Sequence, residues 1–386
     1  MKPDSRDLLL TWLAQWLARS KRHAHQNFAL LIVKLDGGDG DRLRRLVRAE
    51  DTVIELEADT MAIAAADLRH VSDPLRMARR IRAALPGQVS GIGIALSASQ
   101  HNSAVEMLEK AEAAAQSERP YVDGALQKVA EERLELESAL GEAIKQGQIL
   151  PYFQPIVELS SGQITSFEAL ARWEHPTRGS LLPKEFLGVA SDCGLLPDLD
   201  LCILEQSLEQ LSRWQKETER PIRLSVNLCA EHFLRPGGVE RLRPLLDRYA
   251  PVIAQLRVDV SEQVLSEPQG VQALRDLRNL KVGFHLDDFG VGPESFHCLA
   301  SFPFHSLKID RSLICEMEEE VNAELIAALL RIARRMKMRT IAEGLVTHAQ
   351  LEELRNLGCN EAQGFLFSAA VKADAALALL QEEHCW

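Results

Sequence analysis

The chain is organised around the stretch Lys281–Gly290, which reads KVGFHLDDFG. In this stretch a short apolar run ends in two adjacent carboxylates, Asp287 and Asp288. Neighbouring buried carboxylates repel each other, so they stay ionised only beside cations or strong hydrogen-bond donors. One interpretation is a divalent-metal site, because two carboxylates at one strand end can bridge two metal ions. The other is a solvated Asp-Asp-Phe-Gly turn in which Asp287 caps a helix.

Composition limits the kind of protein to which this stretch can belong. A length of 386 residues predicts about two domains. The net charge of −12 argues against non-specific binding to nucleic acid or to an anionic membrane. The seven cysteines are scattered without a C-x-x-C motif, which indicates reduced thiols in a cytoplasm. No signal peptide is recognisable, and the apolar run Leu8–Ala18 is too short to span a bilayer.

The first part of the chain predicts a small α/β domain over residues 1–122. A charged helical stretch, residues 123–147, follows as a connecting helix between domains. In order, the pattern predicts helix 6–20, strand 28–35, helix 42–48, strands 52–56 and 60–66, helix 74–84, strand 90–97 and helix 103–117.

The second part, residues 148–386, alternates short β-like runs with amphipathic helical stretches eight times. That count predicts a (β/α)8 barrel with its active site at the C-terminal strand ends. Only residues 158–163 separate the first two runs, which allows a hairpin but no helical crossover. We therefore expect a modified TIM barrel with one antiparallel strand. The predicted strands are 152–157, 164–170, 223–227, 257–260, 282–286, 306–309, 340–342 and 364–367.

Nearly every predicted strand carries a carboxylate, an amide or a lysine where a barrel would make them converge. An oxygen-only donor set favours Mg²⁺, Mn²⁺ or Ca²⁺, and no Cys/His set with zinc spacing is recognisable. Lys308 and Arg172 supply positive charge for a phosphate. The residues by themselves predict metal-assisted phosphoester hydrolysis. The converging set is Gln154, Glu168, Asn227, Asp259, Asp287, Asp288, Lys308, Glu343 and Gln363.

Several short motifs, taken in order, resemble the EAL-domain family of cyclic di-GMP phosphodiesterases and their catalytically silent relatives. The resemblance covers residues 148–384 and implies a modified TIM barrel that binds cyclic di-GMP. It further implies hydrolysis to linear pGpG with one or two Mg²⁺ or Mn²⁺ ions, inhibition by Ca²⁺, and a homodimer formed through the barrel. The motifs are Tyr152–Ile156 (YFQPI), Glu168–Trp173 (EALARW), Ser225–Asn227 (SVN), Asp287–Gly290 (DDFG), Leu307–Asp310 (LKID), Ala342–Gly344 (AEG) and Gln363–Phe365 (QGF).

The resemblance also implies a role for each matched residue. Lys308 would stabilise the attacking water or the phosphate charge, and Glu343 would act as general base or second-metal ligand. Glu262 would brace the loop after the Asp pair. Metal ligands would be Glu168, which is also catalytic, with Asn227, Asp259, Asp287 and Asp288. The ligand-binding set would be Gln154 on a guanine edge, Arg172 on a phosphate, Leu170, and Gln363, which also supports the metal site.

Three departures from the family pattern keep the function open. The family usually has Glu where Asp259 stands, and it has an acid where Val346 stands. The loop Val291–Ser295 reads VGPES in place of Thr-Gly-Tyr-Ser-Ser. A 1 Å misplacement can cost roughly 10²-fold in rate. The alternatives are therefore a phosphodiesterase of weak activity, a catalytically inactive cyclic di-GMP receptor read by a protein partner, or an interaction module that has lost the nucleotide.

The N-terminal domain resembles a shortened GGDEF (diguanylate cyclase) domain. The signature would lie at Glu57–Met61, where both glycines and the catalytic acid are missing, and Lys34 replaces a metal-binding Asp. The resemblance therefore implies no cyclase activity and a regulatory or dimerising role. Arg48-x-x-Asp51 matches the family's product-inhibition motif, and we prefer a structural Arg–Asp pair over ligand binding there.

Overall fold

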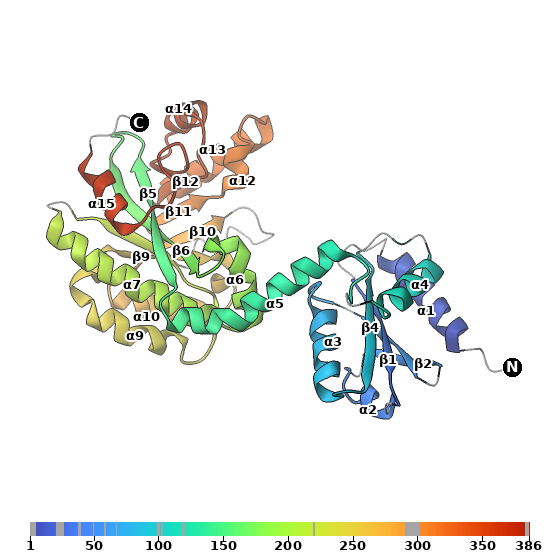
Figure 1. Ribbon diagram of the computed structural model, residues 1–386. Helices are drawn as coiled ribbons and strands as arrows, with labels where there is room; N and C mark the ends of the chain where they lie inside the picture. Colours follow the sequence, from blue (N-terminus) through green and yellow to red (C-terminus); the bar gives the residue numbers. More distant parts are fainter. Residues whose placement is uncertain are drawn as a thin grey trace. The chain divides into compact units, whose positions relative to one another are not determined.

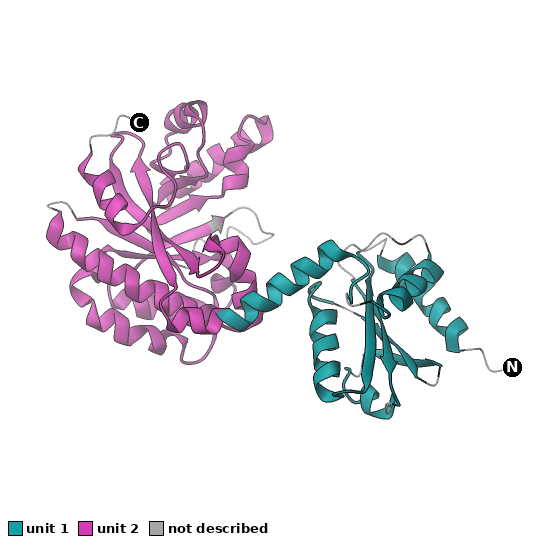
Figure 2. Cartoon of the chain, viewed as in Figure 1, with its two compact units in different colours: residues 1–139 teal, residues 140–386 magenta. Residues whose placement is uncertain are grey.

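The computed structural model divides the chain into two compact units, residues 1–139 and 140–386 (Figure 2). The division falls within helix α5 (Gly124–Lys145), and each unit has its own hydrophobic core. The structure describes residues 5–20, 27–37, 40–48, 50–57, 59–66, 68–98, 101, 103–117, 120–218, 221–289, 302–382 and 386.

Unit 1 is a sheet covered by helices on both faces. Its described strands lie in the order β2 (Thr52–Glu57), β3 (Thr60–Ala65), β1 (Ala29–Leu35) and β4 (Val89–Leu96), and every pairing is antiparallel. Successive β1 side chains point to opposite faces. Leu30 and Ile32 pack in a cluster with α1 (Ser5–Ser20) and α4 (Ala104–Ala114). Leu31 and Val33 pack on the other face, with α3 (Asp73–Ala84) and Leu43 of α2 (Gly40–Arg44). The α/β character predicted for this region follows from these two buried faces.

The Arg48–Asp51 motif forms a turn in this unit. The Asp51 carboxylate accepts a hydrogen bond from the backbone N–H of Arg48 at 2.9 Å. The neighbouring cavity measures about 40 Å³, far less than a dinucleotide needs. In this hydrogen bond between Arg48 and Asp51 the donor is the main chain.

Unit 2 is the predicted barrel, with the expected antiparallel strand (Figure 1). Its described strands form one sheet, which closes where β5 (Ile149–Glu158) pairs with β6 (Ile164–His175). β5 is antiparallel to both of its neighbours, and the short β7 (Gly179–Leu181) extends β6. The parallel strands are β6, β8 (Arg223–Asn227), β9 (Leu256–Ser261), β10 (Gly283–Phe289), β11 (Ser306–Ile309), β12 (Arg339–Glu343) and β13 (Glu361–Gln363).

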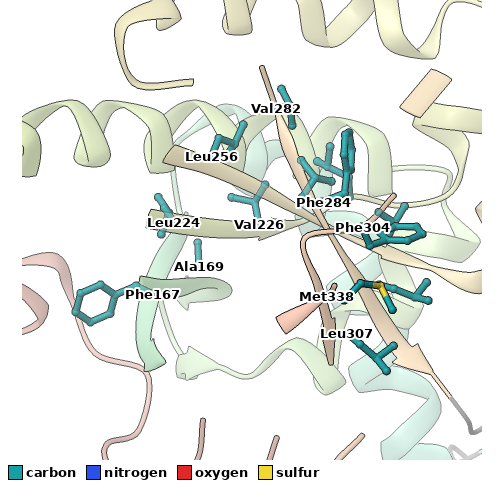
Figure 3. Close-up of a cluster of buried hydrophobic side chains, with 14 of the residues drawn as sticks. Phe167, Ala169, Leu224, Val226, Leu256, Val282, Phe284, Phe304, Leu307 and Met338 are labelled. Carbon is teal, nitrogen blue, oxygen red and sulfur yellow. The ribbon is translucent and has the colours of Figure 1, made fainter. Parts of the chain in front are cut away.

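Amphipathic helices cover the outside of the barrel. Helix α7 (Leu196–Glu217) buries a stripe at helical spacing that includes Leu204, Leu208 and Leu211. Figure 3 shows part of the apolar cluster between strands and helices, including Leu224 of β8. No helix among the described residues is both long and apolar enough to cross a membrane. The other helices are α6 (Pro183–Asp192), α8 (Glu231–Leu234), α9 (Gly238–Arg248), η1 (Ala250–Gln255), η2 (Glu262–Leu265), α10 (Pro268–Asn279), α12 (Arg311–Cys315), α13 (Glu320–Arg335), α14 (His348–Leu357) and α15 (Ala373–Gln381).

The eighth strand was predicted at the wrong place. It is β13, Glu361–Gln363, and not residues 364–367, where the chain turns. The N–H groups of Phe367 and Ser368 both donate to the Gly364 carbonyl, at 3.1 and 3.2 Å. A Cβ on Gly364 would lie 2.1 Å from the Leu345 carbonyl oxygen, so only glycine fits this crossing. The apolar run at 365–367 therefore belongs to a turn, and Phe365 is 66% exposed.

Trp214→Ala should lower the free energy of unfolding by about 3–5 kcal/mol, the usual range for emptying a large aromatic site. Trp214 is fully buried, and its ring centroid lies 4.8 Å from that of Phe153 and 5.3 Å from that of Phe167. Urea denaturation measures the loss. The control is Val321→Ala at a 69% exposed position, which should change stability by less than about 0.5 kcal/mol. Equal effects of the two substitutions would contradict this account of the core.

Candidate active site

The C-terminal ends of the barrel strands meet around one buried ammonium group, that of Lys308 on β11. Its Nζ lies 2.6 Å from Glu343 Oε1 and 2.8 Å from Asp259 Oδ2. It lies 3.3 Å from Asp287 Oδ1 and 3.5 Å from Glu168 Oε2. Among the described residues, four carboxylates from four different strands thus contact one side chain that is 1% exposed.

Strand register explains this convergence. Asn227 on β8 is level with Asp259 on β9, and Asp259 is level with His285 on β10. Glu343 on β12 is level with Gln363 on β13. Because side chains alternate along a strand, residues that are level on neighbouring strands share a face. Short strands with polar C-terminal residues therefore form a layer at one end of the barrel.

Two side-chain amides fix the Glu168 carboxylate. Asn227 Nδ2 donates to its Oε1 at 2.7 Å, and Gln363 Nε2 donates to its Oε2 at 2.8 Å. Gln363 Nε2 also donates to Gln154 Oε1 at 2.9 Å, and Gln154 Nε2 donates to the Ser368 carbonyl at 3.0 Å. Glu168 is thus oriented before any ligand arrives.

The electrostatics show that the cluster is short of positive charge. Burial opposes the charge on Lys308, but the surrounding carboxylates outweigh it and raise the Lys308 pKa well above its usual value. Burial also opposes ionisation of Asp259, yet Lys308 and His285 outweigh it and lower the Asp259 pKa. For Glu343, burial is the largest influence and the neighbouring acids add to it, which raises the pKa to about 8. The Asp287 pKa is raised for the same reasons. One ammonium does not compensate four carboxylates.

The residues present fit a divalent cation. Their donors are carboxylate and amide oxygens, which Mg²⁺ and Mn²⁺ prefer. Gln363 Oε1 is buried and has no hydrogen-bond partner among the described residues, so the cluster lacks a donor or a cation there. Added positive charge would also let Glu343 and Asp287 ionise.

A cavity of about 230 Å³ opens beside the cluster. Val346, which stands where the family has an acid, lies on its rim and is 50% exposed. Arg172 does not line the cavity, but it lies on the same face of β6 as Glu168, and its guanidinium carbon is 5.7 Å from the Tyr152 ring centroid. The lining residues are Gln154, Glu168, Leu170, Arg311, Glu343, Gly344, Val346, Gln363, Gly364 and Phe365.

Some of the predicted roles remain predictions. The side chain of Asp288 and the loop 291–295 lie outside the described residues. Glu262 is 7% exposed and begins η2, directly after β9. Its predicted support of the loop therefore stays a prediction.

Two residues at the site were missed by the sequence analysis. His285 Nδ1 lies 3.0 Å from Asp259 Oδ1. The alternation along β10 could have identified it, because His285 and Asp287 are two residues apart and share a face. Arg311 lines the cavity and passes Gly344, where a Cβ would lie 2.3 Å from Arg311 Cγ and where φ is +79°. No local pattern marks Arg311.

Comparison with protein families and curated proteins gives consistent matches. The family described as "EAL domain" matches residues 137–370. The bifunctional diguanylate cyclase/cyclic di-GMP phosphodiesterase MucR of Pseudomonas aeruginosa is 30% identical over 391 residues, which cover 92% of this chain and 57% of that protein. The cyclic di-GMP phosphodiesterase NbdA of the same organism is 29% identical over 359 residues, which cover 86% of this chain and 46% of that protein. The chain thus spans about half the length of these curated relatives.

Solved structures match as well. The MucR phosphodiesterase in complex with cyclic di-GMP aligns with a TM-score of 0.60 at 32% identity, covering 63% of this chain and 99% of that one. The EAL enzyme Bd1971, bound to cAMP and cyclic di-GMP, aligns with a TM-score of 0.61, covering 92% of this chain and 95% of that one. Its 20% identity supports a shared fold alone.

In metal-free buffer, the contribution of Glu343 to the free energy of unfolding should fall as the pH rises from about 4.5 to about 8. The Glu343 pKa rises from 4.5 to about 8 in the folded state, so in this range the native state holds a proton that the unfolded chain has lost. The stabilisation is complete below pH 4.5 and is lost by about pH 8. Urea denaturation in EDTA across this range measures it.

Glu343→Gln isolates this contribution, because the amide keeps the shape of the side chain and does not titrate. Every other titrating group is common to both proteins, including His305, whose pKa is lowered mainly by burial. With rising pH, the free energy of unfolding of the wild type should decrease relative to that of the variant. Identical slopes would contradict the assignment.

Proposed function

Because this chain belongs to the EAL-domain family, we propose that it hydrolyses cyclic di-GMP to linear pGpG with the help of divalent metal ions. The observation that carries the proposal is the group of four carboxylates around Lys308, next to an open cavity. The names of MucR and NbdA, and the cyclic di-GMP in the MucR structure, support the choice of substrate.

We assign one or two Mg²⁺ or Mn²⁺ ions to the oxygen donors of this cluster, with Ca²⁺ as a binding but inhibitory ion. A bound divalent cation supplies Lewis-acid charge for the scissile phosphate and lowers the pKa of water. Glu168 enters this set already fixed by two amides. The ligands are Glu168, Asn227, Asp259, Asp287 and Asp288.

The chain's own residues would then handle the substrate and the proton. Glu343 would accept the proton of the attacking water, because added positive charge in the cluster keeps its carboxylate ionised for that role. The water oxygen bonds to phosphorus while the bond from phosphorus to one ribose 3′ oxygen breaks and that oxygen takes up a proton. The Lys308 ammonium stabilises the negative charge that builds on the phosphate. Gln154, Leu170, Arg172 and Gln363 hold the guanine and phosphate groups.

A second candidate function is binding without turnover. The Asp259 carboxylate has a neighbour at each oxygen: Oδ2 accepts a hydrogen bond from Lys308 at 2.8 Å, and Oδ1 lies 3.0 Å from His285 Nδ1, outside hydrogen-bond geometry. A shorter acid that is already bonded to Lys308 reaches a metal less easily than the longer glutamate usual in the family. In this case the protein is a cyclic di-GMP receptor whose bound state a partner protein reads.

The wider role follows the same proposal. We assign the protein to the cytoplasm, as a homodimer formed through the barrel unit, with a possible protein partner. Unit 1 acts as a regulatory or dimerising module without cyclase activity, since both signature glycines are missing from the Glu57–Met61 region.

Incubating the wild type with cyclic di-GMP and Mn²⁺ should yield pGpG, and Glu343→Gln should abolish the product. The variant should keep its affinity for cyclic di-GMP within about tenfold, or about 1.4 kcal/mol, because the cavity is otherwise unchanged. Chromatography measures the product, and calorimetry in Ca²⁺ measures binding. Glu353→Gln, at an exposed position on α14, is the control and should be fully active.

The outcome of that assay distinguishes the phosphodiesterase from the receptor. Binding without product from well-folded wild-type protein would exclude the phosphodiesterase and leave the receptor. Absence of both binding and product would exclude both functions.

Val346→Glu combined with Asp259→Glu should raise the rate of pGpG formation if metal geometry limits turnover. Position 346 is 50% exposed on the cavity rim, so a carboxylate there stays hydrated. Position 259 is buried, so the added methylene should cost about 1–3 kcal/mol of stability, which a melting curve checks. An unchanged rate in the folded double variant would assign the limitation to the loop 291–295.

A further inference from the structure

A second polar cluster lies just past the end of β8. Its chemistry differs from that of the barrel mouth, the group of Glu168, Asp259, Asp287 and Glu343 around Lys308. The second cluster joins Asp200 in the first turns of α7, Cys229 in the loop after β8, and His232 in α8. One ligand atom from each of these residues lies within 4.8 Å of the others. The sequence analysis found no Cys/His set with zinc spacing. Spacing could not reveal this cluster, because Asp200 lies far from the other two residues in the sequence.

The histidine is the clearest indication that this cluster binds a ligand. The His232 side chain is 1% exposed, and its Nε2 has no hydrogen-bond partner within the part of the chain that the structure describes. Nε2 lies 3.3 Å from Asp200 Oδ2, outside hydrogen-bond geometry. That oxygen already accepts the backbone N–H of Cys229 at 2.7 Å. A buried imidazole nitrogen without a partner is costly, and a metal ion would satisfy it.

The surroundings of the thiol favour a cation as well. Burial raises the pKa of Cys229, and the carboxylates of Asp200 and Glu231 lie close enough to raise it further. Negative groups thus gather around the thiol. The Glu231 side chain is 30% exposed, so it offers a fourth ligand at the solvent edge.

We propose that Asp200, Cys229 and His232 form a zinc site, with Glu231 or water completing the coordination. Thiolate, imidazole and carboxylate together suit Zn²⁺, whereas the oxygen-only mouth suits Mg²⁺ or Mn²⁺. Binding displaces the thiol proton to solvent and ties the start of α7 to the loop after β8. That loop begins directly after Asn227, so the zinc site would restrain the chain next to a residue that contacts Glu168.

Titration of the metal-free full chain with Co²⁺ tests the proposal directly. A thiolate ligand gives a sulfur-to-cobalt charge-transfer band that an oxygen-only site cannot give, so the mouth does not interfere. We expect one equivalent of Co²⁺ to produce this band and Zn²⁺ to abolish it. Zn²⁺ should also raise the melting temperature of the wild type.

Matched variants assign the ligands. Cys229→Ser should remove the band, and His232→Gln should weaken Co²⁺ binding by at least about 100-fold, the upper end of what loss of a mere outer-shell partner costs. Cys193→Ser and Cys315→Ser, at exposed cysteines outside this cluster, should leave the band unchanged. Melting curves in EDTA show whether each variant is folded. A wild type without the band, a band that survives in folded Cys229→Ser, or an unchanged Co²⁺ affinity in folded His232→Gln would overturn the proposal.

Discussion

The barrel mouth depends on a single buried ammonium. Four acids from four strands approach Lys308, and without it their mutual repulsion would act in a site that water barely reaches. Removing one member of such a buried group leaves an uncompensated charge and typically costs about 3–5 kcal/mol. Lys308 therefore belongs to the architecture of the mouth as much as to its chemistry, since it allows the strands to present their acids to one point.

The four acids around Lys308 are not equivalent, and their neighbours explain the difference. The Asp259 carboxylate is fully buried and lies between Lys308 and His285, while Glu168 is held by two amides. Asp287 and Glu343 lie nearer to solvent, with side chains 17% and 20% exposed. They are also the two acids whose pKa is raised, with burial as the main cause. The deep acids organise the site, and the acids nearer to solvent respond to a proton or a cation.

Two clusters with different ligand chemistry lie within a few residues of the end of β8. Asn227 faces the oxygen-rich mouth, while Cys229 turns toward Asp200 and His232. Hard and soft donors prefer different cations, so the two clusters favour different metals. The loop after β8 lies between them and links the core of the barrel to α7.

Sequence alone determined the parts that depend on local pattern. Alternating strands and amphipathic helices predicted the barrel, and the short link at 158–163 predicted its antiparallel first strand. Polar residues at strand ends predicted most of the mouth, because parallel strands in register bring their ends to one level. The eighth strand was misplaced because the apolar run at 365–367 follows a glycine whose role is a close backbone crossing.

Only the tertiary structure decided which residues that are far apart in the sequence come into contact. It placed Lys308 among four acids, gave Asp259 a histidine partner, and brought Arg311 past Gly344 to the cavity. It also brought Asp200 to Cys229 and His232 across a long stretch of chain. Local periodicity reports which face of a strand or helix a side chain occupies. Charge compensation and coordination depend on which faces meet, and that is a property of the folded barrel.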